Sequence, residues 1–100
     1  MAQLVVVYWR DIPAQVIVKK GRESAKVQLT ERFEKAIDRA AMRANLRDTD
    51  SYLAEWRRAS PVEVSDDLQA EVDKKAAELE ATFDDAKLKS LVESGGVEKV

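Results

Sequence analysis

The first apolar run of the chain, residues 4–9 (LVVVYW), constrains the fold more than any other segment. Its β-branched and aromatic residues favour a strand. Successive side chains of a strand point to opposite faces, and here both faces are apolar: Leu4, Val6 and Tyr8 on one, and Val5, Val7 and Trp9 on the other. A strand of this kind is usually covered on both sides. We therefore expect it at the centre of a sheet, with helices or a partner chain over each face.

Two further strands are expected before residue 30. The segment Asp11–Pro13 predicts a turn, because Pro13 fixes its own φ and disfavours helical geometry at Ile12. A second strand is predicted at residues 15–20 and a third at residues 25–29, where apolar and polar residues alternate. Residues 21–24 predict the hairpin loop between them, with Gly21 free to adopt a positive φ. Residues 1–29 therefore predict an antiparallel meander.

Residues 30–60 predict two helices. Thr30 is a typical N-cap, and Phe33, Ile37 and several alanines recur at helical spacing up to about residue 46. The other face of this helix carries charges of both signs, which predicts a solvated surface: Arg32, Lys35, Asp38, Arg39 and Arg43. The second helix is predicted from the cap-rich residues 48–51 to residue 60. It would carry Tyr52, Leu53 and Trp56 and end before Pro61.

Residues 61–64 (PVEV) predict either a short edge strand or an extended link. Ser65 is expected to cap a third helix, and Asp84 to begin a fourth that stops at Gly95-Gly96, within residues 65–96. Residues 97–100 are expected to be a tail. Strands first and helices after indicate one α+β domain over residues 1–100. We expect a three- to four-stranded antiparallel sheet packed with about four helices.

The composition removes several kinds of chemistry. The 100 residues include no cysteine and no histidine, which excludes disulfides, thiolate nucleophiles, imidazole bases and the commonest transition-metal ligands. No glycine-rich phosphate loop is present. The carboxylate pairs at residues 66–67 and 84–85 lie where helices are expected to start, and the helix dipole accounts for them. We predict a protein that is not an enzyme, with no catalytic residue, metal site or cofactor.

Charge is unevenly distributed along the chain, although the net charge is only -2. Residues 1–60 carry 12 Lys/Arg against 8 Asp/Glu, whereas residues 61–100 carry 5 against 11. The first part is therefore where an anionic partner would be sought, and the alternative is that these charges form solvated faces. A pI of about 5.2 and the missing RNP-type aromatic spacing weigh against nucleic acid. No apolar run has membrane-spanning length and no signal peptide is recognisable, so we expect a cytoplasmic protein without a membrane partner.

The remaining candidates for a site are aromatic and basic residues in three segments, of the types that anchor protein interfaces or stack on planar ligands. They are Tyr8, Trp9, Arg10 and Asp11 after the first strand, Lys19, Lys20 and Arg22 at the hairpin, and Trp56, Arg57 and Arg58. The alternative is structural. Both tryptophans would then belong to the core with their indole N–H groups bonded to loop carbonyls, and Arg10 and Asp11 would clasp the turn.

The segments VVYWRDIPAQVIVKKGR, RFEKAIDRAAMRA and YLAEWRR resemble a bacterial family known as the virulence factor family. The resemblance covers roughly residues 3–64 and is most distinctive at WRDIPAQV. Members are short stand-alone proteins, and the same segment is a domain of conserved virulence factor C proteins. The resemblance supplies no catalytic residues. It also associates the chain with gene neighbourhoods for folate-dependent one-carbon metabolism and corrinoid methyl transfer, which implies an accessory subunit.

Two hypotheses of function follow. The first is a non-enzymatic protein-interaction module, acting as an accessory subunit or through self-association. It is motivated by the strand that is apolar on both faces, the missing catalytic residue types and the turn rich in Trp and Arg. The second is a protein that binds a small molecule or anion, such as a folate, a nucleotide or a phosphorylated metabolite. In that case the basic hairpin would supply charge and the aromatic residues a stacking surface.

Overall fold

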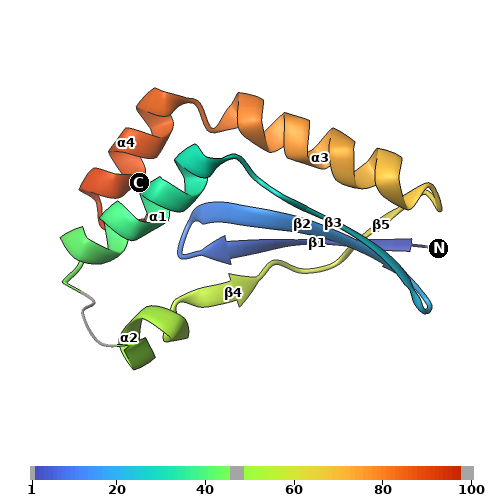
Figure 1. Cartoon of the computed structure of the whole chain (residues 1–100), viewed down its shortest axis with the longest axis horizontal. Coiled ribbons are helices and arrows are strands. Elements are labelled where there is room, and N and C mark those ends of the chain that lie inside the picture. The colour runs from blue at the N-terminus through green and yellow to red at the C-terminus, as the bar shows by residue number, and fades with distance from the viewer. Residues whose placement is uncertain (1, 46–48, 98–100) are drawn as a thin grey trace.

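The computed structural model describes residues 2–45 and 49–97 and shows an α+β fold, as predicted (Figure 1). Nine elements follow one another along these residues: β1 Ala2–Trp9, β2 Ile12–Lys20, β3 Glu23–Gln28, α1 Glu31–Arg43, α2 Thr49–Ala54, β4 Trp56–Arg58, β5 Val62–Val64, α3 Leu68–Thr82 and α4 Asp85–Glu93. Their strands form a single antiparallel sheet in the order β3-β2-β1-β4, with β5 also paired to β1. The central position predicted for residues 4–9 is therefore confirmed.

The turn between β1 and β2 is tighter than predicted. It consists of Arg10 and Asp11 alone, with Arg10 at a φ of +53°. Pro13 lies inside β2 rather than in the turn, opposite Tyr8, and Ala14 is an extra residue at this irregularity in the pairing. The irregular site tolerates Pro13 because a bulge disrupts the ladder locally.

The prediction of a helix up to residue 60 is wrong. The helix α2 ends at Ala54, and Trp56–Arg58 is a strand that pairs with the end of β1. Of the two alternatives for residues 61–64, the short edge strand is confirmed, because Val62–Val64 pairs with the start of β1. Between the two strands, residues 59–61 lie opposite Val5 and Val6, so β4 and β5 form one edge interrupted by a bulge.

Carboxylates accept hydrogen bonds at the starts of more helices than predicted. Thr30 is the N-cap residue of α1, but its side chain makes no capping bond. Its backbone N–H and its hydroxyl bond to the Glu80 carboxylate of α3, at 2.8 and 3.0 Å. The cap of α3 is Asp67, so the prediction for Ser65 is wrong. Asp84 caps α4 as predicted. Residue 46, where α1 was expected to end, and residues 98–100 of the expected tail lie outside the described residues.

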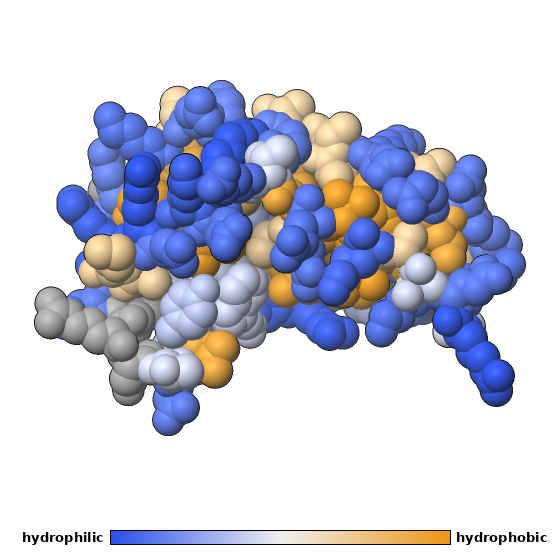
Figure 2. Space-filling view, viewed as in Figure 1, coloured by the Kyte–Doolittle hydropathy of each residue, from blue (hydrophilic) through white to orange (hydrophobic). Residues whose placement is uncertain are grey.

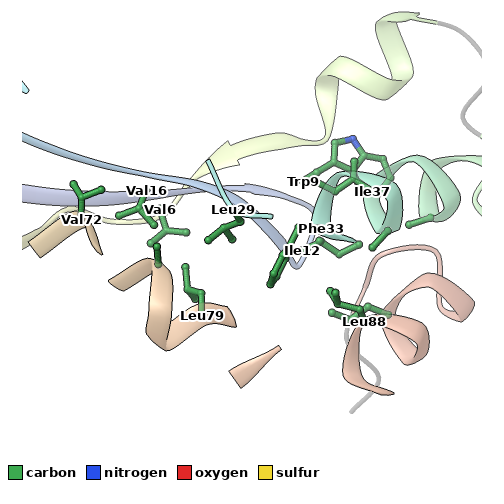
Figure 3. Close-up of a cluster of buried hydrophobic side chains, with 14 of the residues drawn as sticks. Val6, Trp9, Ile12, Val16, Leu29, Phe33, Ile37, Val72, Leu79 and Leu88 are labelled. Atoms are coloured by element: carbon green, nitrogen blue, oxygen red, sulfur yellow. The ribbon is translucent and has the colours of Figure 1, made fainter. Parts of the chain in front are cut away.

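The hydrophobic core lies between one face of the sheet and the helices α1, α3 and α4. Val6 and Val16 point to the side on which α3 supplies Val72 and Leu79 (Figure 3). At the turn end of the sheet, the core is completed by Phe33 and Ile37 of α1 and by Ile12 and Leu88 (Figure 3). These residues are all less than 10% exposed, which accounts for the apolar stripes of the helices.

The second face of β1 is covered only at one end. Trp9 is fully buried there, next to Ile37 of α1 (Figure 3). Figure 1 shows α3 and α4 above the sheet, with α2 below its left end. Beyond this left end, Figure 1 shows no helix of the described residues below the sheet. Val5, Val7 and Ile17 lie on the sheet face opposite to that of Val6 and Val16 and stand outside the main core cluster. Of the two kinds of cover expected, the chain's own helices thus supply it over Trp9 but not over the rest of this face, and a partner chain there stays a prediction.

Candidate functional site

The β1–β2 turn is held by contacts with two distant segments. Arg10 donates from Nη1 to the Gly95 carbonyl at 2.9 Å and from Nη2 to Glu55 Oε1 at 3.3 Å. The backbone N–H of Asp11 bonds to the Gly96 carbonyl at 2.8 Å. The turn therefore joins the start of β4 to the residues after α4, and we call this junction the clasp.

Arg57 completes the clasp from β4. Its Nε donates to the Arg10 carbonyl at 2.9 Å, and its Nη2 lies 3.2 Å from a carboxylate oxygen of Asp11. The guanidinium also lies 4.7 Å from the centre of the half-buried Tyr8 ring. The polar or aromatic groups of four of the ten candidate residues are thus engaged in contacts within the protein: Tyr8, Arg10, Asp11 and Arg57.

The tryptophans occupy different environments. Trp9 has no exposed surface, stacks on Tyr52 with ring centres 5.7 Å apart, and donates from Nε1 to the Tyr52 carbonyl at 3.1 Å. Trp56 is half-buried and packs edge-on against the same tyrosine. Burial raises the pKa of the Tyr52 phenol, and the carboxylates of Asp38 and Glu34 raise it further. Trp9 is a core residue, and Trp56 keeps part of its ring accessible.

The hairpin residues lie at the opposite end of the sheet from the tryptophans. Lys19 pairs with Gln3 at the start of β1, whereas Trp56 pairs with Trp9 at its end. Lys20 bonds to Asp66 at 2.9 Å, and this contact raises the pKa of Lys20 and lowers that of Asp66. The structure therefore does not bring the basic hairpin and the aromatic residues into one ligand site.

The uncovered part of the second sheet face is the surface that remains. Its centre is a strip of Val5, Val7 and Ile17, of which Val7 and Ile17 are 8% and 9% exposed. Long polar side chains border the strip and shield it: Gln3, Gln15, Lys19, Lys26 and Arg58. We call these eight residues the open face. Shallow hollows of about 460 Å³ beside Val7 and about 60 Å³ beside Val5 interrupt it.

The open face includes two of the ten candidate residues, Lys19 and Arg58, and its other six residues were not among those candidates. Alternation along β1 identified Val5 and Val7 as one face. Lys26 joins them because it pairs with Ile17 across the β2–β3 ladder, and this register cannot be read from one strand. Arg22 lies in the exposed hairpin turn.

A groove separates α3 from the β4–β5 edge of the sheet. Its volume is about 330 Å³, its floor is apolar, and α3 contributes both acidic and basic residues to its rim. Figure 2 shows hydrophobic surface between hydrophilic side chains beneath α3. The charges on the rim balance, because Glu71 and Glu78 stand beside Lys74 and Lys75. The groove therefore indicates no particular ligand charge.

Two further findings concern metals and membranes. Within residues 2–45 and 49–97, no three His, Cys, Asp or Glu side chains are grouped so that they could hold a metal ion. In the same residues, no helix combines the length and the apolar character required to cross a membrane.

The family model described as virulence factor matches residues 7–92. The chain therefore belongs to the virulence factor family. The match extends beyond the distinctive sequence segments through α3 and most of α4, so the acidic helices are part of the family's domain. No curated protein and no solved structure matches the chain.

Proposed function

We propose that this member of the virulence factor family is a non-enzymatic protein-interaction module, an accessory subunit that binds an acidic segment of another protein through its open face. The observation that carries the proposal is the position of Val5, Val7 and Ile17. These three β-branched residues lie on a sheet face over which the described residues place no helix.

The border of the open face supports an acidic partner. Lys19, Lys26 and Arg58 surround the strip, and none of them makes an ion pair with a described residue. Glu63 pairs with Gln3 at the edge of the same face, so the cations outnumber it by three to one. The apolar stems of long side chains of this kind cover the strip while their charges remain in water. A partner that displaces these stems would uncover the strip. An acidic segment with apolar residues would match both the charge and the strip.

Two other occupants fit less well. A second copy stacked face to face through a twofold axis would bring the same three cations together, which disfavours association. Single-stranded nucleic acid would match the charge. However, the centre of the face is aliphatic, and proteins of that class stack bases on aromatic rings.

The proposal that the chain is not an enzyme is supported by its residue types. The sequence has no histidine or cysteine. The carboxylates of Asp67 and Asp84 accept backbone hydrogen bonds at the starts of α3 and α4, so helix capping accounts for them. The family resemblance to proteins encoded beside folate and corrinoid methyl-transfer enzymes makes an enzyme of that class the first partner to test.

The test is co-purification from the native host, followed by reconstitution with the purified partner. The variant K26E/R58E reverses two cations of the open face, and R39E/K89E reverses two exposed cations on α1 and α4 as a matched control. We expect the first variant to weaken the affinity about tenfold or more and the control to leave it unchanged. Raising the salt concentration should weaken the wild-type complex.

Three results would contradict the proposal. One is a complex that survives K26E/R58E but is lost in R39E/K89E. Another is a wild-type chain that retains no protein and remains a monomer by light scattering. The third is salt-sensitive retention on RNA or DNA that K26E/R58E abolishes, because it would assign the open face to nucleic acid.

A further inference from the structure

Two acidic residues of the helix α1 lie apart from three of its basic residues. Arg32, Lys35 and Arg39 line a groove between α1 and α4. Glu34 and Asp38 line a different hollow, next to Tyr52 and Trp56. The sequence pattern predicted a solvated face that carries charges of both signs, Asp38 among them. The structure instead places the cations on the side facing α4, without those two carboxylates.

The groove between α1 and α4 has a volume of about 310 Å³, near the lower end of the range for small-molecule sites. Its floor consists of Ala36, Leu88 and Val92. The wall on α4 adds Lys89 and Asp85, so the lining holds four cations and one carboxylate. An apolar floor beneath an excess of positive charge suits an organic anion.

Two of the four cations are already engaged. Arg32 lies 2.9 Å from Glu80 Oε1 and 3.4 Å from Asp85 Oδ1, and it donates to backbone carbonyls of Glu80 and Phe83. Lys35 lies 3.7 Å from Glu31. These contacts hold Arg32 in place on one side of the groove.

The other two cations have no counter-ion among the described residues. Arg39 and Lys89 line the groove from opposite helices and make no ion pair with any described residue. Like charges facing each other across a groove repel, and an anion between them would turn this repulsion into attraction. The guanidinium of Arg39 has the planar fork that binds phosphate oxygens in pairs.

We propose that the α1–α4 groove binds a small phosphate monoester, with the phosphate between Arg39 and Lys89 and an apolar substituent on Ala36, Leu88 and Val92. Lys35 lies one turn from Arg39 and adds positive charge to the same site. The single carboxylate in the lining, Asp85, is paired with Arg32 and does not cancel the two free cations. This site is separate from the open face on the sheet.

Phenyl phosphate is the probe for this site, because it combines a dianion at pH 7.5 with a small apolar ring. We expect two-dimensional NMR titrations of the full chain to shift the amide signals of α1 and α4 around Ala36 and Leu88. Inorganic phosphate should bind more weakly, because it leaves the floor uncovered, and phenol should not bind. The variant R39Q/K89Q should weaken phenyl phosphate binding about tenfold or more.

The control is K26Q/R58Q, which removes the same charge from the open face and should leave the dissociation constant unchanged. Vesicles of phosphatidylcholine with phosphatidic acid distinguish a lipid headgroup from a soluble phosphate. Retention of the wild-type chain but not of R39Q/K89Q would identify the lipid as the source, and no retention would identify a soluble ester. The proposal is overturned if phenyl phosphate shifts no signals in α1 and α4, or if R39Q/K89Q binds it as tightly as the wild type. Because each double variant is the control for the other surface, failure here leaves the proposed function untouched.

Discussion

Replacing Gly96 with alanine tests the packing of the C-terminal segment on the central strand. Gly96 has a φ of +92°, and an added Cβ would lie 2.7 Å from Cζ3 and 3.2 Å from Cε3 of Trp9. It would also lie 3.4 Å from the Cβ of Ala40. Trp9 has no exposed surface, so its ring cannot move into open space to relieve the contact.

The expected cost has two parts. A residue with a side chain at positive φ loses about 1–2 kcal/mol. Overpacking in a well-packed core costs about 1–3 kcal/mol more. The sum, about 2–5 kcal/mol, is a large share of the 5–15 kcal/mol that stabilises a typical domain. The expected result is a strong loss of stability with little change in the denaturant slope.

Gly21 is the matched control, because it also has a positive φ, +58°, but nothing within 4 Å of an added Cβ. G21A should therefore show the backbone cost alone. The difference between G96A and G21A in urea unfolding should be about 1–3 kcal/mol, which corresponds to about 4 °C or more in melting temperature. Equal stabilities for the two variants would refute the packing of Gly96 on Trp9.

Three further perturbations test other parts of the fold. Truncation after Val64 removes Val72, Leu79 and Leu88 from the core, each worth about 1.5–3 kcal/mol, so residues 1–64 alone should lose cooperative unfolding; a sharp thermal transition would contradict this. Although burial opposes it, hydrogen bonds from Thr30 and the charge of Arg32 hold the pKa of Glu80 below its ordinary 4.5. Ionised Glu80 therefore stabilises the fold above pH 4.5, and this contribution is lost as the pH falls through the lowered pKa of Glu80. E80Q should be less stable than the wild type at pH 7, and the difference in their free energies of unfolding, measured in urea, should decrease in acid. A difference that does not change with pH would argue against the contacts of Glu80 with Thr30 and Arg32. In K20M, NMR titration should show the pKa of Asp66 rising toward its ordinary value, because the contact with Lys20 is lost. The melting temperature should stay the same, because the ion pair is exposed. An unchanged pKa of Asp66 would be evidence against the contact.

Local patterns predicted the parts of the fold that depend on neighbouring residues. Alternation identified the central strand, and helical spacing identified Phe33 and Ile37 as residues of a buried helix face. The error at residues 56–58 has a physical cause. Tyr52 and Trp56 are spaced four apart as in a helix, but pairing with the end of β1 gives Trp56–Arg58 strand geometry instead. Tertiary contacts of this kind override local propensity.

The candidate site was harder to predict because a residue's type does not say which partner it meets. Arg10 and Arg57 are of the types that anchor interfaces, yet both are engaged within the clasp. Conversely, Arg39 belongs to a face that the sequence pattern assigned to solvent, and only the position of α4 shows that Lys89 stands across the groove from it. Both outcomes depend on contacts between residues more than 40 positions apart in the chain.

The clasp also bears on what the family's most distinctive segment does. Its residues Trp9, Arg10 and Asp11 bond to Tyr52, Glu55, Arg57 and the residues after α4, so they hold together three parts of the chain. These bonds within the protein indicate that the segment stabilises the fold rather than binds a ligand. Differences in partner or ligand among family members should then arise from residues that make no such contacts. In this chain those residues include the cations of the open face and the pair Arg39 and Lys89, so substitutions there should change binding while leaving the clasp and the stability of the domain intact.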